Sequence, residues 1–168
     1  MLTPATTSPR CSKPISALAS PPLSFSSASR KNRGRGLEDF TEALVREVFG
    51  ENFDSRCQFT GVGGATGKCD FAIPNRNKPM ILIEAKGYGA TGSKMTDVFG
   101  DANKIINAKR PDIPFILITD GITWMRRMND LRKLIKLQNA GSIMRIYTTK
   151  MAAAFLADLK QLKAEYGL

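Results

Sequence analysis

The chain has 168 residues, a length typical of one domain with a single hydrophobic core, and none of its apolar runs approaches the ~20 residues of a membrane-spanning helix. Hydrophobic residues make up 42% and charged residues 24%, which are ordinary values for a globular protein. Lys and Arg number 25 against 15 Asp and Glu, and this net charge of +10 favours an anionic partner, nucleic acid before an acidic membrane.

The first 30 residues differ in composition from the remainder. They hold five prolines and many serines without hydrophobic periodicity, and residues 1–35 carry six of the basic side chains and no acid. Such a segment buries too little apolar surface to offset its ordering entropy. We therefore expect a disordered tail at 1–30 and one domain at 31–168. The tail also resembles an organelle transit peptide, which is the alternative to a cytoplasmic location.

Histidine is absent, and this excludes a Ser-His-Asp triad, a Cys-His pair and any zinc site that needs an imidazole. Three cysteines cannot form a four-cysteine zinc site or a disulfide framework. Cys57 and Cys69 lie in strand-like segments, and we interpret them as buried free thiols in a reducing compartment. Catalysis is left to Asp, Glu, Lys, Tyr, Ser or a metal with oxygen ligands.

Hydrophobic spacing and turn residues predict the elements of the first half of the chain. These are a helix at 37–49 that stops at Gly50, a strand at 56–60, a glycine-rich turn at 61–67, a strand at 68–73, a turn at 74–79 and a strand at 80–86. The glycine-rich turn lacks the Gly-Lys-Ser/Thr ending of a phosphate-binding loop, so we interpret it as a hairpin turn.

The second half is predicted to alternate helices and strands. It contains a loop at 87–92, a helix with an apolar stripe from Met95 to Ile106, a buried central strand at 114–119, a helix around 131–135 closed by Gly141, a strand at 143–148 and a last helix capped by Thr149. The whole order predicts an α/β fold with a mixed central sheet flanked by helices.

Three charged residues stand out in the predicted strands. Asp70 lies in the second strand, and Glu84 and Lys86 end the third, two positions apart and so on one face. Antiparallel strands joined by a short turn can bring Asp70 beside Glu84. A divalent cation between the carboxylates would relieve the cost of burying them, and Lys86 could hold or help deprotonate a metal-bound water. The alternative is a salt-bridged strand pair on a half-exposed face.

This arrangement resembles the PD-(D/E)xK nuclease superfamily, in which an Asp precedes a Glu-x-Lys triplet. The stretches RKNRGRGLEDFTEALV (30–45), GSKMTDV (92–98) and ILITDGITW (116–124) resemble type II restriction endonucleases of the DpnII/MboI kind. The resemblance covers about residues 30–150. It implies an αβββαβ restriction-endonuclease-like core.

The resemblance also implies a Mg²⁺-dependent endonuclease, with Mn²⁺ as a possible substitute. Asp70, Glu84 and the Ala85 carbonyl would bind metal, and Lys86 would position the attacking water and stabilise charge on phosphorus. Glu38, on the first helix, matches an acidic position that reaches the metal in many such nucleases; the alternative is a solvated carboxylate near the helix start.

The implied substrate is double-stranded DNA, cut by a homodimer, with a cognate methyltransferase encoded nearby. The candidate DNA-contacting residues are Arg33, Arg35, Ser93, Lys94, Arg126 and Arg127. An N-cap is the plainer role for Ser93, and Trp124 is expected to pack rather than contact a base. Two other functions stay open: a repair or Holliday-junction-resolving nuclease on the same fold, and a catalytically inactive DNA-binding module.

Overall fold

A computed structural model describes residues 33–87, 98–120, 124–125 and 127–168, with side chains from residue 36 onward. The predicted tail lies outside these ranges. The described elements are α1 (Arg33–Phe49), β1 (Asp54–Thr60), the 3₁₀ helix η2 (Val62–Gly64), β2 (Thr66–Ile73), β3 (Ile81–Gly87), α2 (Val98–Ala108), β4 (Phe115–Asp120), α3 (Met128–Asn139), β5 (Arg145–Tyr147), the 3₁₀ helix η4 (Thr149–Met151) and α4 (Ala152–Tyr166). Their order confirms the predicted one.

The five strands form one mixed sheet in the order β1-β2-β3-β4-β5. The first three strands pair antiparallel, and β3, β4 and β5 run parallel. Parallel neighbours need a crossover connection, and the chain passes through α2 and then α3 between these strands. The predicted α/β fold with a mixed sheet is therefore confirmed, although β3 rather than β4 is the middle strand.

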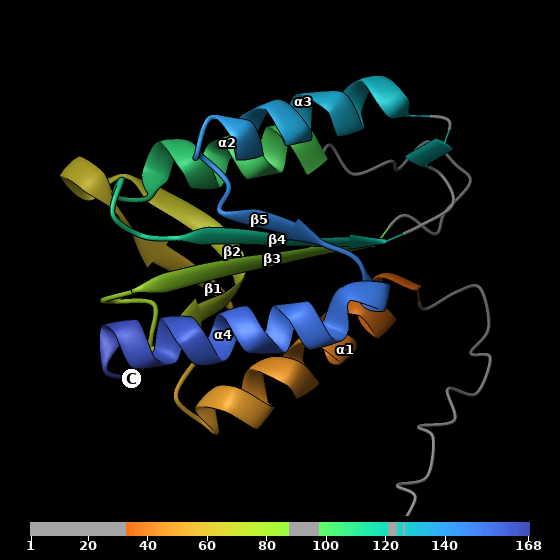
Figure 1. Ribbon diagram of the computed structural model, residues 1–168. Coiled ribbons are helices and arrows are strands. Elements are labelled where there is room, and N and C mark those ends of the chain that lie inside the picture. The colour runs from red at the N-terminus through yellow and green to blue at the C-terminus, as the bar shows by residue number, and fades with distance from the viewer. Residues whose placement is uncertain (1–32, 88–97, 121–123, 126) are drawn as a thin grey trace, which may run out of the picture.

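Helices cover both faces of the sheet (Figure 1). The apolar side chains of α2 and α3 pack on one face, and those of α1 and α4 pack on the other. Because β3 and β4 are covered on both sides, their sequences are almost continuously apolar, as is usual for buried parallel strands. None of the described helices is long and apolar enough to cross a membrane.

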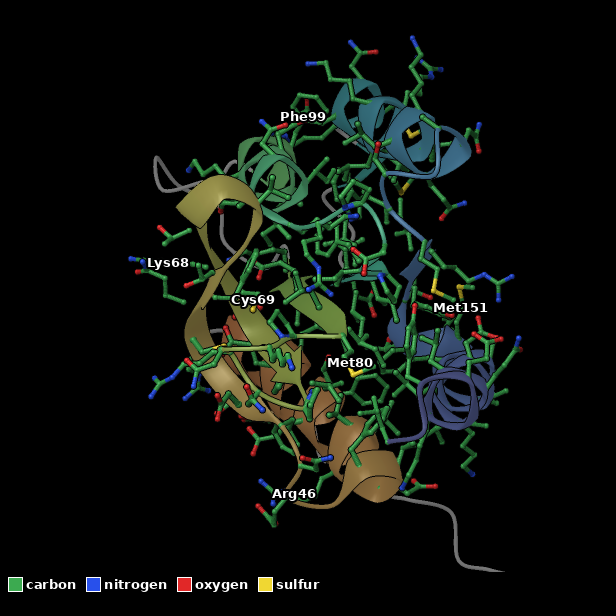
Figure 2. All side chains as sticks on the ribbon, turned by 90° about the vertical axis from the view of Figure 1, so that its left-hand side faces the viewer. Arg46, Lys68, Cys69, Met80, Phe99 and Met151 are labelled. Carbon is green, nitrogen blue, oxygen red and sulfur yellow. The ribbon has the colours of Figure 1, made fainter. Side chains whose placement is uncertain are left out.

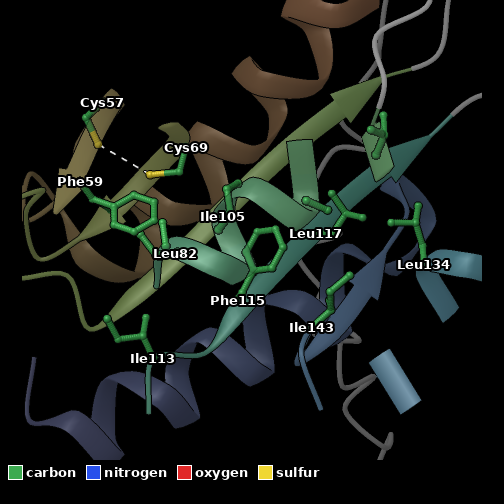
Figure 3. Close-up of a cluster of buried hydrophobic side chains, with 14 of the residues drawn as sticks. Cys57, Phe59, Cys69, Leu82, Ile105, Ile113, Phe115, Leu117, Leu134 and Ile143 are labelled. Atoms are coloured by element: carbon green, nitrogen blue, oxygen red, sulfur yellow. Dashed lines mark hydrogen bonds between the residues drawn. The ribbon is translucent and has the colours of Figure 1, made fainter. Parts of the chain in front are cut away.

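The two strand cysteines belong to the core under α2 and α3. Cys57 of β1 pairs directly with Cys69 of β2, and their sulfur atoms lie 3.8 Å apart (Figure 3). Both thiols are buried and free. The predicted buried thiols are thus confirmed, and the pairing of β1 with β2 brings them together.

Three local predictions need correction. Thr149 is not a side-chain cap: its hydroxyl donates to Asp120, and neither η4 nor α4 has a capping side-chain hydrogen bond. The predicted strand at 143–148 shortens to Arg145–Tyr147, because only these residues have partners on β4. In α3, Leu134 is buried but Ile135 is exposed, so the apolar stripe is narrower than the sequence suggested.

Candidate active site

The backbone pairing between β2 and β3 ends before Asp70 and Glu84, where hydrogen bonds from backbone N–H groups to the two carboxylates replace it. Their register runs to Phe71 and Ile83, and the next position places Asp70 opposite Glu84. There the Asp70 N–H donates to Glu84 Oε2 at 3.1 Å, and the Ala85 N–H donates to Asp70 Oδ2 at 2.7 Å. The two carboxylates are held side by side, as the short turn between the strands predicted.

The alternation of side chains between the two faces of the sheet is interrupted in β2 at Asp70. Cys69 packs under α2 and α3, whereas Phe71 packs under α1 and α4, although alternate residues of a regular strand share one face. The register of β1 places Arg56 opposite Asp70, and Arg56 has a φ of +46°. Both strands are therefore irregular at one point, and this bend leaves Asp70 free to bond to the end of β3.

Lys86 joins the carboxylates from the same face of β3 as Glu84. Its Nζ lies 2.8 Å from Glu84 Oε1 and 4.0 Å from Asp101 Oδ2 of α2. Glu84 is only 4% exposed, so the carboxylate of this ion pair is buried, whereas the Lys86 side chain is partly exposed. Sequence reasoning missed Asp101. The one sequence signal for it is its position as the acidic residue in the first turn of α2.

The three charged groups perturb one another. Burial raises the pKa of Asp70 more than the hydrogen bond from Ala85 lowers it. Burial and the nearby Asp70 charge raise the pKa of Glu84 to about 7. For Lys86, burial lowers the pKa, but the charge and hydrogen bond of Glu84, with Asp70 and Asp101, outweigh burial and raise it. Lys86 is therefore an ammonium at neutral pH.

A buried threonine fastens the end of β3 that carries Lys86. Thr119 of β4 pairs with Lys86, and its hydroxyl donates to the Lys86 carbonyl at 2.8 Å. The Trp124 indole N–H donates to the same hydroxyl at 3.0 Å. Trp124 is buried in the core, which confirms the expected packing role. Sequence reasoning missed the hydrogen bond of Thr119 to Lys86, because a threonine in a buried strand belongs to no recognisable motif.

A pocket of about 360 Å³ opens over the carboxylates. It extends along the hairpin of β1 and β2, and Lys68 lies at the outer edge of that hairpin (Figure 2). Its charged lining consists of two acids and three bases. The lining residues are Arg56, Cys57, Gln58, Lys68, Cys69, Asp70, Glu84 and Lys86.

The other residues predicted from the sequence lie outside this cluster or outside the described ranges. Glu38 of α1 accepts a hydrogen bond from Arg56 Nε at 3.0 Å. Arg127 forms an ion pair with Asp130 at the start of α3. Arg33 and Arg35 lie in the first turn of α1, with side chains outside the described part of the chain, and Ser93, Lys94 and Arg126 lie outside it entirely.

The family model of the DpnII restriction endonucleases matches residues 24–154, which is most of the chain. The chain belongs to this family. Membership confirms the resemblance seen in the sequence, and the matched residues include the whole cluster of Asp70, Glu84 and Lys86.

Two curated relatives are type II restriction enzymes. DpnII of Streptococcus pneumoniae is 26% identical over 99 residues, which is 58% of this chain and 33% of the relative. MjaIII of Methanocaldococcus jannaschii is 37% identical over 70 residues, which is 39% of this chain and 24% of the relative. The matches span a third or less of each relative's length. No solved structure matches the chain with comparable significance.

Proposed function

We propose that this member of the DpnII family is a type II restriction endonuclease that hydrolyses phosphodiester bonds of double-stranded DNA with Mg²⁺. The observation that carries the proposal is the meeting of Asp70, Glu84 and Lys86 where the backbone pairing between β2 and β3 ends. Two buried carboxylates beside each other are costly to ionise unless a cation joins them. Family membership supports DNA as the substrate.

The residues fit a hard divalent cation such as Mg²⁺, with Mn²⁺ as a substitute. Mg²⁺ commonly uses one or two carboxylates and keeps several waters, and no three His, Cys, Asp or Glu side chains converge in the described ranges. Asp70 and Glu84 would supply the carboxylates. The Ala85 carbonyl would add a third oxygen, because the N–H and C=O of an extended residue face one strand edge and its N–H meets Asp70.

The bound metal would activate a water and offset charge on the phosphate. Lys86 keeps its proton beside Glu84, so it would hold the attacking water and stabilise negative charge at phosphorus rather than act as a base. Asp101 and Thr119 hold the side chain and the backbone of Lys86 in place. Glu38, which the sequence predicted as a fourth catalytic residue, acts on Asp70 only through its charge, from α1.

The proposed DNA-contacting residues remain Arg33, Arg35, Ser93, Lys94, Arg126 and Arg127. Of these, Arg127 would have to share its charge between a phosphate and Asp130. The proposed assembly is a homodimer, because two active sites related by a two-fold axis can cut both strands of a symmetric site. A cognate methyltransferase would protect the host DNA.

The test is plasmid cleavage in Mg²⁺ by the full chain and three variants. We expect Asp70→Ala and Glu84→Gln to abolish cleavage, because each removes a metal-binding charge, and Lys86→Ala to slow it roughly a hundredfold. Glu165→Gln makes the same chemical change as Glu84→Gln at an exposed position of α4; it is the control and should cleave normally. Melting temperatures of all four variants separate loss of chemistry from loss of fold.

The pattern of products decides between the possible activities. Discrete plasmid fragments would support restriction activity. Cleavage of branched junctions without a sequence rule would instead indicate a resolving nuclease, and DNA binding without cleavage would indicate an inactive module. Full cleavage by Asp70→Ala would overturn the proposed site.

A further inference from the structure

Arg56 is a pocket residue that the proposed chemistry has not used. It occupies the position of β1 opposite Asp70, and it lines the same pocket as Asp70, Glu84 and Lys86. Its φ of +46° is a backbone region that residues other than glycine rarely adopt. A glycine or asparagine would be expected if only the bend mattered, so an arginine at this position indicates a use for the side chain.

The guanidinium of Arg56 is accessible and oriented. The side chain is 62% exposed, and Glu38 Oε2 accepts a hydrogen bond from its Nε at 3.0 Å. Among the residues that the structure describes, no other carboxylate lies within ion-pair distance of Arg56. A single contact through Nε leaves most of the planar donor edge available to another anion.

The pocket needs such a cation because its inner end is acidic. Asp70 and Glu84 repel a phosphodiester that approaches them, and Lys86 already pairs with Glu84. Arg56 and Lys68 are the cations on the outer wall, and Lys68 pairs with Gln58 two positions along the hairpin from Arg56. A guanidinium binds phosphate through two parallel hydrogen bonds, which fixes orientation as well as charge.

We propose that Arg56 binds a backbone phosphate of duplex DNA at the mouth of this pocket, and that Glu38 is a positioning residue that orients Arg56. The inference rests on the proposed nuclease function and adds a substrate-binding residue to it. It assigns Glu38 to the arginine rather than to the metal.

Duplex DNA binding without divalent metal tests the contact separately from catalysis. Arg56→Gly retains the backbone conformation and removes the charge, so the slope of log affinity against log salt should fall by about 0.9, the value for one phosphate contact. Arg76→Gly, an exposed arginine in the turn after β2, is the matched control and should retain the slope. If Arg56→Gly fails to fold, Arg56→Asn is the second variant, because asparagine tolerates positive φ.

Cleavage with Mg²⁺ provides the second measurement. We expect Arg56→Gly to slow single-turnover cleavage roughly a hundredfold, and added guanidinium at millimolar concentration to restore part of the rate. Glu38→Gln should slow cleavage in the natural chain but not in the Arg56→Gly background, because Glu38 acts through Arg56. An equal effect of Glu38→Gln in both backgrounds would assign Glu38 to the metal and overturn its positioning role.

The failures of the two proposals are distinguishable. If the natural chain binds DNA but never cleaves it, the nuclease proposal fails while the salt slope still tests the phosphate contact. If the natural chain cleaves and Arg56→Gly retains both the slope and the rate, the nuclease proposal stands and the role of Arg56 is wrong.

Discussion

Glu84 is a proposed metal-binding residue whose burial is energetically costly. Glu84 and Leu82 lie on the face of β3 that α2 covers, so the Glu84 carboxylate is buried beside apolar side chains. The Asp70 N–H and the Lys86 ammonium satisfy its oxygens, but Asp70 also brings a second negative charge. A cation is the simplest way to stabilise both carboxylates together.

The raised pKa of Glu84 predicts how stability depends on pH. Between its ordinary value of 4.5 and about 7, folded Glu84 retains a proton that the unfolded chain has lost. The Glu84 contribution to stability is therefore present below pH 4.5 and declines as pH rises towards 7. The difference in melting temperature between the natural chain and Glu84→Gln, measured without metal across this range, should fall accordingly.

Mg²⁺ should reverse this effect above pH 7, because it binds the ionised carboxylates of the folded chain. We expect added Mg²⁺ at pH 8 to raise the melting temperature of the natural chain but not of Glu84→Gln. Glu165→Gln should respond to pH and metal like the natural chain. Identical pH profiles for the natural chain and Glu84→Gln would contradict the assigned pKa.

At the scale of elements, the β1–β2 hairpin is fixed by contact with the end of α2. Gly61 follows β1 directly, and a Cβ at this position would lie 1.7 Å from the Ala108 carbonyl oxygen. Gly67 of β2 likewise faces the Phe59 ring, 2.7 Å from a hypothetical Cβ. Gly61 and Gly67, predicted only as turn residues, are therefore also packing residues, and they set the position of the strands that carry Arg56 and Asp70.

Gly61→Ala should destabilise the protein by about 1–3 kcal/mol or more, since the methyl group meets backbone rather than a movable side chain. Gly36→Ala is the matched control. No atom lies within 4 Å of its added Cβ, and it lies in α1, so we expect a gain of about 0.5–1 kcal/mol. Urea unfolding of both variants measures the difference; equal stability of Gly61→Ala and the natural chain would contradict the close approach.

At the scale of the whole molecule, two helical layers cover a sheet, and the proposed active-site residues of β3 lie at the carboxyl end of the parallel strands. Lys86 and Thr119 are paired on β3 and β4, near the carboxyl end of both strands. The N-terminal ends of these strands lie in the core. Connections after parallel strands leave such ends open to ligands, which explains why the pocket opens there.

The described part of a single chain contains one such proposed site, and double-strand cleavage needs two. We therefore expect a homodimer on symmetric duplex DNA. Sedimentation velocity with a labelled duplex should show two chains on each DNA molecule. A complex of one chain per duplex at saturating protein would contradict the dimer and favour nicking or binding alone.

The sequence alone determined the order of helices and strands and the identity of the central charged residues. Apolar runs such as those of β3 and β4 are strong local signals, and a short turn between antiparallel strands restricts which residues can meet. Asp70, Glu84 and Lys86 could therefore be selected before the structure. The absence of histidine and the presence of only three cysteines further restricted the catalytic chemistry that the chain could carry out.

Only the tertiary structure decided what surrounds these residues. The bend at Arg56 and Asp70 appears in no local pattern, because it arises from the pairing of two strands that are both irregular at one register position. Asp101 and Thr119 reach Lys86 from other elements, so their roles depend on packing across the sheet. Glu38 meets Arg56 across 18 positions of sequence. Contacts between distant segments follow from the three-dimensional arrangement of the core, which periodicity along the chain does not encode.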